Sequence, residues 1–388
     1  MRKIILICEG LHDQTIVAQP WKHVIELATR MKKLGIDVEI VSDKLPGKEE
    51  SKEINSVPIE RVNKKGLFLD TKALAKLLNQ EKPNIVNWHC SDIWSSFYFW
   101  RLRKKTDFNM VWTLHSGPLT LNDVMNLSFH DILQLHNFWN NFVNAYFPKT
   151  MIRSWANVPS VKHIITLSKR MAHRLVSFGI DDQKVTCIPS GVDVDVFRPS
   201  RESFEDDSSI LYFGPLSSFR GIDVLLAAYA EIRKRFTPAR LVILARGAKP
   251  DNNWLKKTES VANLEIVWGT LSQEEVIRHV QRSSVVALPF KFWPQIECPS
   301  TILEAMSMGK AVVTTSIGGV QEMVQNGENG LVIPPNDSKR LANVILGLLN
   351  RPDVRDKLGK RARQHVEQFY DWRIITGDTM KVLSKYAE

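Results

Sequence analysis

The sequence has little cysteine. Its four cysteines stand at Cys8, Cys90, Cys187 and Cys298, with no paired spacing. Zinc frameworks and disulfide-rich secreted folds need paired spacings, so the sequence supports neither. Most of these cysteines lie beside strand-like apolar runs, which favours buried thiols in a reducing compartment. We therefore expect a cytoplasmic protein, and peripheral contact with the inner face of a membrane stays open.

Long uncharged apolar runs are also missing. A membrane-spanning helix needs ~18–20 consecutive apolar residues, and no stretch reaches that length without charges. The start Met1-Arg2-Lys3 and the apolar run Ile4–Cys8 look like the beginning of a secretion signal, but the run is too short before Glu9. We interpret this run as a first buried strand.

Positive charge, in contrast, is in excess. The 388 residues include 52 Lys and Arg against 42 Asp and Glu, a formal net charge of +10. Such an excess favours anionic partners: nucleotides, phosphorylated substrates, nucleic acid or an acidic membrane surface. A solvated basic face is the plain alternative. Nucleic acid is not expected, because the basic residues form no patch interleaved with aromatic residues.

Short strands and helices alternate along most of the chain. Strands are predicted at 3–8, 36–41, 85–88, 111–114, 162–167 and 185–188, and again, after a polar linker at 200–209, at 210–213, 241–245, 264–268, 285–289, 311–314 and 331–333. This alternation is typical of an α/β protein with parallel sheets. The length is sufficient for two such domains. A last helix at 372–386 has no strand after it and could cross back to the first domain.

Residues 121–155 break this alternation. The segment is rich in aromatic side chains, followed by two basic ones: Phe138, Trp139, Phe142, Tyr146, Phe147, Lys149 and Arg153. One interpretation is a helical region that packs on the sheet or covers a cleft. The other is a surface that receives a lipid or membrane-bound substrate.

The stretch 296–335 combines carboxylates with glycine turns. Glu297 lies in a polar loop, and a helix is predicted to begin near Pro299–Ser300, to carry Glu304 and to end at Gly309. Strands at 311–314 and 331–333 follow. Because ligands bind outside the carboxyl ends of parallel strands, we expect a ligand site here.

Several motifs, in this order and spacing, resemble the family 4 glycosyltransferases, a family that includes glycogen synthases and phosphatidylinositol mannosyltransferases. The motifs are V-K-H-I-I-T-L-S-K-R-M at 161–171, I-P-S-G-V-D-V-D-V-F-R-P at 188–199, G-P-L-S-S-F-R-G at 214–221, E-C-P-S-T-I-L-E-A-M-S-M-G-K-A-V-V at 297–313 and G-G-V-Q-E-M-V-Q-N-G-E-N-G-L-V-I-P-P-N-D at 318–337. The match spans most of the chain.

The resemblance implies the GT-B fold: two Rossmann-like, doubly wound parallel-sheet domains that face a cleft. Residues 1–198 would then form the acceptor-binding domain, and 371–388 would cross back to it. Residues 199–370 would form the nucleotide-sugar-binding domain. The implied reaction moves a sugar from a nucleoside diphosphate sugar to a hydroxyl of a glycan, lipid or small molecule, with retention of anomeric configuration.

The resemblance also assigns roles to the two glutamates. Glu304, in L-E-A-M, matches the glutamate that binds the ribose hydroxyls; the alternative is a glutamate that only complements the helix dipole. Glu297 matches the catalytic-site glutamate at the donor sugar. The six residues between them are one fewer than the family usually has, so Gln295 remains open as a polar substitute.

The implied leaving group is a diphosphate, which needs positive charge and N–H donors. The helix start at Ser300 is suited to it, and the backbone amides of Thr301 and Ile302 are the expected donors.

The glycine turn that begins at Gly214 should supply cations to the same diphosphate. Arg220 stands where the family has a lysine, and Pro215 stands where it has an arginine. Arg246, after a strand, could supply the missing charge; a solvated arginine is the alternative. No Asp-x-Asp motif lies beside these residues, so we expect no metal and no cofactor other than the donor co-substrate.

Histidines at strand ends are the candidates for proton chemistry and acceptor contacts. His115 resembles the strand-end histidine of the family near the donor sugar, where it could bond a sugar hydroxyl or manage the acceptor proton. A structural histidine is the alternative. His89 and His12 are weaker candidates on the acceptor side.

Two rival functions stay open. A nucleotide-sugar epimerase could share the fold. A catalytically weakened nucleotide-sugar-binding subunit would fit Pro215 and the short glutamate spacing.

Overall fold

The computed structural model describes residues 3–13, 15, 19–48, 50–65, 68–90, 102, 108–117, 149–200, 207–246, 252–269, 271–291 and 297–387. Contacts between residues divide the chain into two compact units. Unit 1 is Met1–Ser190 with Trp372–Glu388, and unit 2 is Gly191–Asp371. Most of the predicted linker at 200–209, most of the aromatic segment at 121–155, and Gln295 lie outside the described residues.

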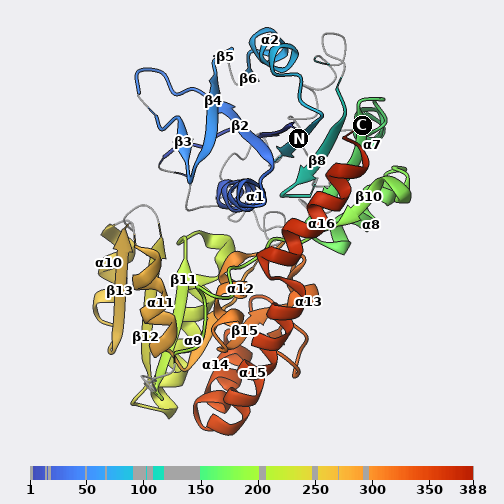
Figure 1. Ribbon diagram of the computed structural model, residues 1–388. Helices are drawn as coiled ribbons and strands as arrows, with labels where there is room; N and C mark the ends of the chain where they lie inside the picture. Colours follow the sequence, from blue (N-terminus) through green and yellow to red (C-terminus); the bar gives the residue numbers. More distant parts are fainter. Residues whose placement is uncertain are drawn as a thin grey trace. The chain divides into compact units, whose positions relative to one another are not determined.

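Unit 1 contains a sheet in the order β10-β9-β8-β7-β1-β2-β4-β3 (Figure 1). All its pairs are parallel except β3 with β4. The strands are β1 Lys3–Ile7, β2 Asp37–Asp43, β3 Glu53–Ile54, β4 Val57–Val62, β7 Ile85–Cys90, β8 Met110–Leu114, β9 Val161–Thr166 and β10 Val185–Cys187; a separate hairpin joins β5 Lys64–Lys65 and β6 Phe68–Leu69.

Helices cover both faces of this sheet. They are α1 Trp21–Lys33, α2 Thr71–Glu81, α7 Lys149–Ala156, α8 Lys169–Ser177 and α16 Trp372–Lys385, with a short 3₁₀ turn η1 at Asp182–Lys184. The period of two along β1 directs Ile4 and Leu6 into one core with α1 and α16, and Ile5 and Ile7 into another with α2, α7 and α8. The predicted last helix is therefore α16, which lies beside α1 in unit 1 (Figure 1).

Unit 2 contains a second parallel sheet, in the order β13-β12-β11-β14-β15-β16. This is the doubly wound order, in which the chain leaves the first strand in one direction and later returns to its other side. The strands are β11 Ser209–Gly214, β12 Arg240–Arg246, β13 Leu264–Gly269, β14 Val285–Leu288, β15 Ala311–Thr315 and β16 Leu331–Ile333.

The helices of unit 2 connect these strands and cover the sheet. They are α9 Ile222–Arg235, α10 Asn252–Glu259, α11 Gln273–Arg282, α12 Ser300–Ser307, α13 Val320–Met323, α14 Ser338–Leu349 and α15 Pro352–Phe369, with a 3₁₀ turn η2 at Ser218–Arg220. Gly309 ends the α12 turn at φ 69°, the left-handed conformation expected for it. The predicted fold class, α/β with two parallel-sheet domains, is confirmed.

Several details differ from the sequence interpretation. The short strands β3, β4, β5 and β6 and the helix α10 were not predicted. In β4, Pro58 and two charged residues interrupt the short apolar pattern. The contacts group residues 191–198 with unit 2, whereas the predicted boundary placed them in the first domain. Val192 explains this grouping, since its N–H donates to the Tyr370 carbonyl at 2.8 Å.

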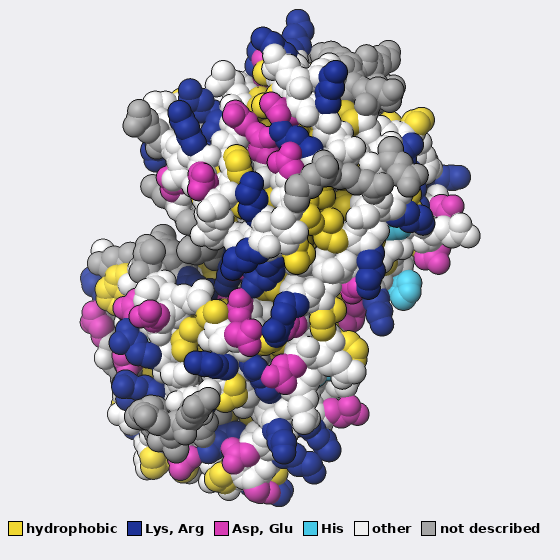
Figure 2. Space-filling view, in the orientation of Figure 1, with side chains coloured by type: hydrophobic (Ala, Val, Ile, Leu, Met, Phe, Trp, Pro, Cys, Tyr) yellow, Lys and Arg dark blue, Asp and Glu magenta, His cyan; other side chains and the backbone are white. Residues whose placement is uncertain are grey.

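Charged side chains are widely distributed on the described surface. On the face that Figure 2 shows, Lys and Arg lie scattered among acidic and uncharged side chains on both units. Among the described residues, no helix is long and apolar enough to cross a membrane.

Candidate functional sites

In unit 2, the strand order reverses between β11 and β14. Several of the predicted site residues lie at or after the ends of β11, β12 and β14. Gly214 ends β11, and Arg246 ends β12 in the neighbouring position of the sheet. The chain after β14 leads, through a segment outside the described residues, to Glu297 and α12. The carboxyl edge at such a reversal is where doubly wound domains bind ligands.

Gly214 leaves room for the side chain of Arg220. Gly214 has φ 141°, and a Cβ built there would lie 2.8 Å from Nη1 of Arg220. The guanidinium lies 5.5 Å from the ring centre of Phe290. Burial lowers the pKa of Arg220 from its ordinary value, opposed by the nearby Tyr212 hydroxyl. Its Nη1 has no hydrogen-bond partner among the described residues, so this desolvated cation has an N–H to offer an anion.

Arg246 and Glu304 form an ion pair at the same edge. Nη2 of Arg246 lies 3.4 Å from Oε2 of Glu304, whose side chain is only 1% exposed. The Arg246 guanidinium also lies 5.7 Å from the ring centre of Phe213. The structure therefore places Arg246 beside Glu304, and its role at the diphosphate stays a prediction.

The start of α12 offers two backbone donors and one hydroxyl. Ser300 and Thr301 have no backbone acceptor for their N–H groups among the described residues. Ile302, in contrast, donates its N–H to the Pro299 carbonyl at 3.1 Å, so that predicted diphosphate donor is already engaged. The buried Oγ1 of Thr301 has no partner in the described part of the chain. An anion at this helix start would find the amides of Ser300 and Thr301 and this hydroxyl.

Glu297 is buried, 3% exposed, directly before α12. The chain that precedes it, with Gln295, lies outside the described residues, so the choice between Glu297 and Gln295 stays a prediction.

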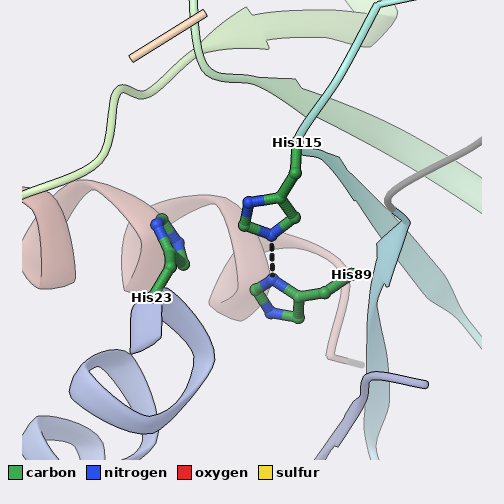
Figure 3. A group of neighbouring side chains, drawn as sticks. All are labelled: His23, His89 and His115. Atoms are coloured by element: carbon green, nitrogen blue, oxygen red, sulfur yellow. Dashed lines mark hydrogen bonds between the residues drawn. The ribbon is translucent and has the colours of Figure 1, made fainter. Parts of the chain in front are cut away.

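In unit 1, three histidines meet where β7 and β8 end and α1 begins. His89 is the next-to-last residue of β7, His115 directly follows β8, and His23 lies in the first turn of α1 (Figure 3). Nδ1 of His89 lies 3.0 Å from Nε2 of His115 in a hydrogen bond. The His115 N–H donates to the Cys90 carbonyl at 2.9 Å, which holds the two strand ends together.

The third ring of the group is that of His23, which lies beside both other rings. Its centre lies 4.9 Å from that of His115 and 5.6 Å from that of His89. Its Nδ1 lies 3.1 Å from Oγ of Ser190, and Trp372 of α16 contacts it edge-on. This cluster lies beside the β1–β7 reversal of the unit 1 sheet, where the strand order changes direction.

The three rings are held neutral. Burial lowers the pKa of His23 to about 3. Burial also lowers the pKa of His89 and His115 well below the ordinary value, and each is lowered further by the neighbouring rings. Neutral imidazoles keep a lone pair that can accept a proton or a hydrogen bond.

The comparison with family models identifies the chain. A model described as "Glycosyltransferase Family 4" matches residues 21–196, and one described as "Glycosyl transferases group 1" matches residues 207–351. The chain is a family 4 glycosyltransferase. Both models describe transferases, so the matches do not favour the epimerase alternative.

Curated relatives of this glycosyltransferase are distant. A glycogen synthase of Mycobacterium tuberculosis is 27% identical over 236 residues, 60% of this chain and 56% of that protein. The matched part is thus little more than half of that relative. A D-inositol 3-phosphate glycosyltransferase of Kribbella flavida is 25% identical over 393 residues, 92% of this chain and 88% of that protein.

Solved structures show the same fold. A sucrose-phosphate synthase from Thermosynechococcus elongatus superposes with a TM-score of 0.81 at 18% identity, covering 99% of both chains. Anabaena HepE in complex with UDP-glucose superposes with a TM-score of 0.75 at 15% identity, covering 99% of this chain and 100% of that one. The predicted GT-B architecture of the glycosyltransferase is confirmed.

His12 of the glycosyltransferase lies in a separate ionic cluster. Its Nδ1 lies 2.7 Å from Glu50, and its Nε2 lies 3.4 Å from Asp43. Lys64 lies 3.0 Å from the same Asp43. Both ring nitrogens therefore have carboxylate partners, and the acceptor role of His12 stays a prediction without support from this geometry.

Sequence reasoning missed two groups of the glycosyltransferase. His23 is far from His89 and His115 in sequence; the available signal was its place at the first helix start after the first strand. The Thr301 hydroxyl was overlooked beside its amide, although a threonine at the second position of a helix also faces the helix start.

Proposed function

We propose that the glycosyltransferase moves a sugar from a nucleoside diphosphate sugar to a hydroxyl acceptor, with retention of anomeric configuration. The bond from the anomeric carbon to the diphosphate oxygen breaks, and a bond from that carbon to the acceptor oxygen forms. The acceptor proton leaves to a base, and the diphosphate leaves as an anion.

One observation carries the donor assignment. Cationic groups and donors that have no partner among the described residues lie at the carboxyl edge of unit 2: Nη1 of Arg220, the Arg246 guanidinium, and the α12 start with the Thr301 hydroxyl. A diphosphate is the anion that would use both a guanidinium fork and a helix start. These groups would stabilise the charge that develops on the leaving group.

Glu304 is the proposed ribose ligand. Its buried carboxylate next to Arg246 can accept hydrogen bonds from a vicinal diol while the arginine turns toward phosphate. Anabaena HepE has been solved with UDP and with UDP-glucose, which supports uridine diphosphate sugars as the first donors to test.

The acceptor side is proposed for unit 1. His115, kept neutral by burial, can bond a sugar hydroxyl or receive the acceptor proton. A same-face attack, in which the leaving phosphate oxygen assists removal of the acceptor proton, would account for retention without a covalent intermediate. The acceptor would be a glycan or a lipid-linked hydroxyl, and membrane contact would be peripheral.

A binding panel tests the donor class. Purified protein is titrated calorimetrically with UDP-, GDP- and ADP-sugars, and we expect one of the three to bind at one site per chain. Transfer to water or to a mixed glycan acceptor is then followed by release of the nucleoside diphosphate. Failure of all three donors to bind would contradict the assignment.

The decisive variant is Glu304→Gln. Loss of charged hydrogen bonds worth about 1.5–3 kcal/mol should weaken donor binding by roughly 10- to 100-fold, while the fold persists. Glu265→Gln, which removes an exposed carboxylate paired with Arg240, is the matched control and should bind as the wild type does. Equal affinity of Glu304→Gln and wild type would refute the ribose role.

A nucleotide-sugar-binding subunit without transfer remains the second candidate. Pro215 stands in the glycine turn where the family has an arginine, which removes one cation from the diphosphate site. Tight donor binding with no release of nucleoside diphosphate would favour this function.

A further inference from the structure

The histidine cluster of unit 1 has a geometry that the transfer reaction does not require. His23, His89 and His115 each offer one ring nitrogen, and these three nitrogens all lie within 4.8 Å of one another (Figure 3). Sugar binding or proton transfer needs one imidazole. Three convergent imidazoles are instead the donor set of a transition-metal site.

We propose that His23, His89 and His115 bind a divalent transition-metal ion, with Zn²⁺ as the ion of the test. Zinc–nitrogen bonds of about 2.0–2.1 Å in tetrahedral geometry hold ligand nitrogens roughly 3.3 Å apart. Nδ1 of His89 and Nε2 of His115 already lie 3.0 Å apart. His23 is the ligand that must approach, by a rotamer adjustment in the first turn of α1.

One hydrogen bond supports a ligand at this place. Nδ1 of His23 lies 3.1 Å from Oγ of Ser190, which leaves Nε2 for a metal. A hydroxyl or carbonyl on the far nitrogen is the usual support of a metal-bound histidine.

The proton balance is simple. In the structure, His89 and His115 share one N–H between them, so one of these rings donates and the other accepts. When both facing nitrogens bind the ion, each of these rings carries its proton on its other nitrogen, and all three rings stay neutral. His115 can then donate its Nδ1–H to a sugar hydroxyl, whereas receiving the acceptor proton belongs to the metal-free protein. No net proton release is required, because burial already keeps the rings uncharged.

The chemistry of the donor set restricts the ion. Imidazole suits Zn²⁺, Cu²⁺, Ni²⁺ and Co²⁺, whereas Mg²⁺ and Ca²⁺ prefer oxygen ligands. Three protein ligands leave a fourth position of a tetrahedral ion for water or an anion. His115 is the partly exposed member of the cluster, so this position would open on its side.

The test measures metal binding directly, in the absence of sugars, so that it does not depend on the proposed function. Chelator-treated full-length protein is titrated with Zn²⁺ by calorimetry and with Co²⁺ by visible absorption, since a four-coordinate Co²⁺ site gives intense bands. We expect one ion per chain and tetrahedral Co²⁺ bands that Zn²⁺ displaces.

Variants locate the ion. His23→Gln and His89→Gln should each weaken binding by more than tenfold, and Ser190→Ala, which removes a supporting hydroxyl, should weaken it by roughly 10-fold. His173→Gln, an exposed histidine on α8, is the matched control and should bind as the wild type does. Circular dichroism checks that each variant folds, and Ser190→Ala serves if a histidine variant does not.

Two results would overturn the proposal. One is the absence of saturable binding of Zn²⁺ and Co²⁺ by the wild type. The other is wild-type affinity in the folded His23→Gln, His89→Gln and Ser190→Ala variants, which would place any bound ion elsewhere.

Discussion

At the scale of single residues, close backbone approach shapes the proposed donor site of unit 2. Gly221 lies between η2 and α9 with φ 71°, and a Cβ there would lie 1.8 Å from the Pro289 carbonyl oxygen. This contact joins the turn that carries Arg220 to the chain that follows β14. A glycine is therefore required on steric grounds, independently of any ligand.

Gly221→Ala should be strongly destabilising. The added methyl group meets a backbone oxygen and also requires a left-handed conformation, so we expect a loss of roughly 3 kcal/mol or more in the free energy of unfolding. Gly347→Ala is the control, because no atom of the described residues lies within 4 Å of a Cβ at this exposed position of α14. It should stabilise by about 0.5–1 kcal/mol. Urea unfolding of the full chain compares the two, and equal midpoints would contradict the steric argument.

At the scale of elements, β9, β10 and α16 meet around one buried histidine. Nε2 of His163 lies 2.8 Å from Oγ1 of Thr186, and its ring stacks on Tyr386 at 5.5 Å between centres. Burial lowers the pKa of His163 to about 4, helped by Lys385 and Lys184. The C-terminal helix thus contributes to a neutral, desolvated imidazole at the edge of the unit 1 sheet.

The lowered pKa of His163 predicts that the free energy of unfolding depends on pH. Its folded pKa of about 4 is below the ordinary 6.5. Between these values the unfolded chain binds more protons, so stability falls as pH falls through this range, by up to roughly 3 kcal/mol. The contribution is fully present above pH 6.5.

His163→Gln tests this sign. The variant cannot titrate, so its unfolding midpoint should decline less than that of the wild type between pH 6.5 and pH 4. His173→Gln, exposed to water on α8, should keep the wild-type slope. Parallel slopes for His163→Gln and wild type would show that another group is responsible.

At the scale of the whole molecule, two parallel sheets carry two different kinds of site. Unit 2 presents cations, N–H groups and Glu304, and unit 1 presents neutral imidazoles. If the proposed function is correct, donor binding and transfer can be separated by mutation, because the proposed nucleotide ligands belong to unit 2.

His115→Ala should make this separation. Loss of a group that manages a proton or a sugar hydroxyl should lower transfer by roughly 100-fold or more. Donor affinity should stay within about threefold, since Glu304 and the cations are unchanged. Calorimetry and nucleotide release measure the two effects, with His173→Ala as the control. Loss of donor binding together with the fold would instead make His115 a structural residue.

Much of the fold could be predicted from the sequence, because the patterns that indicate strands and helices involve neighbouring residues. Apolar runs of four to seven residues, bounded by glycine turns and helix starts, identified most strands, and the predicted 331–333 matches β16. Among the strands that this reasoning missed, β4 has two exposed residues and contains Pro58, so its local pattern is weak. Its pairing with β2 provides the stability that its own residues do not indicate.

The residues of the candidate sites could be predicted from the sequence only in part. Gly214, Arg220, Arg246 and Glu304 were expected together, and the structure joins Gly214 to Arg220 and Arg246 to Glu304. The engagement of the Ile302 amide by Pro299 was not predicted. It depends on the torsion angles of a single turn before α12, which composition and spacing do not specify.

The sequence by itself determined the α/β class, the alternation of elements and the family, because period, turn residues and motif order are properties of neighbouring positions. Only the tertiary structure decided which distant groups meet. His23 joins His89 and His115 because α1 begins where β7 and β8 end in one parallel sheet, and the crossover connections hide that proximity from the linear chain. The same packing removes water from the three rings, and this desolvation, rather than any motif, holds them neutral.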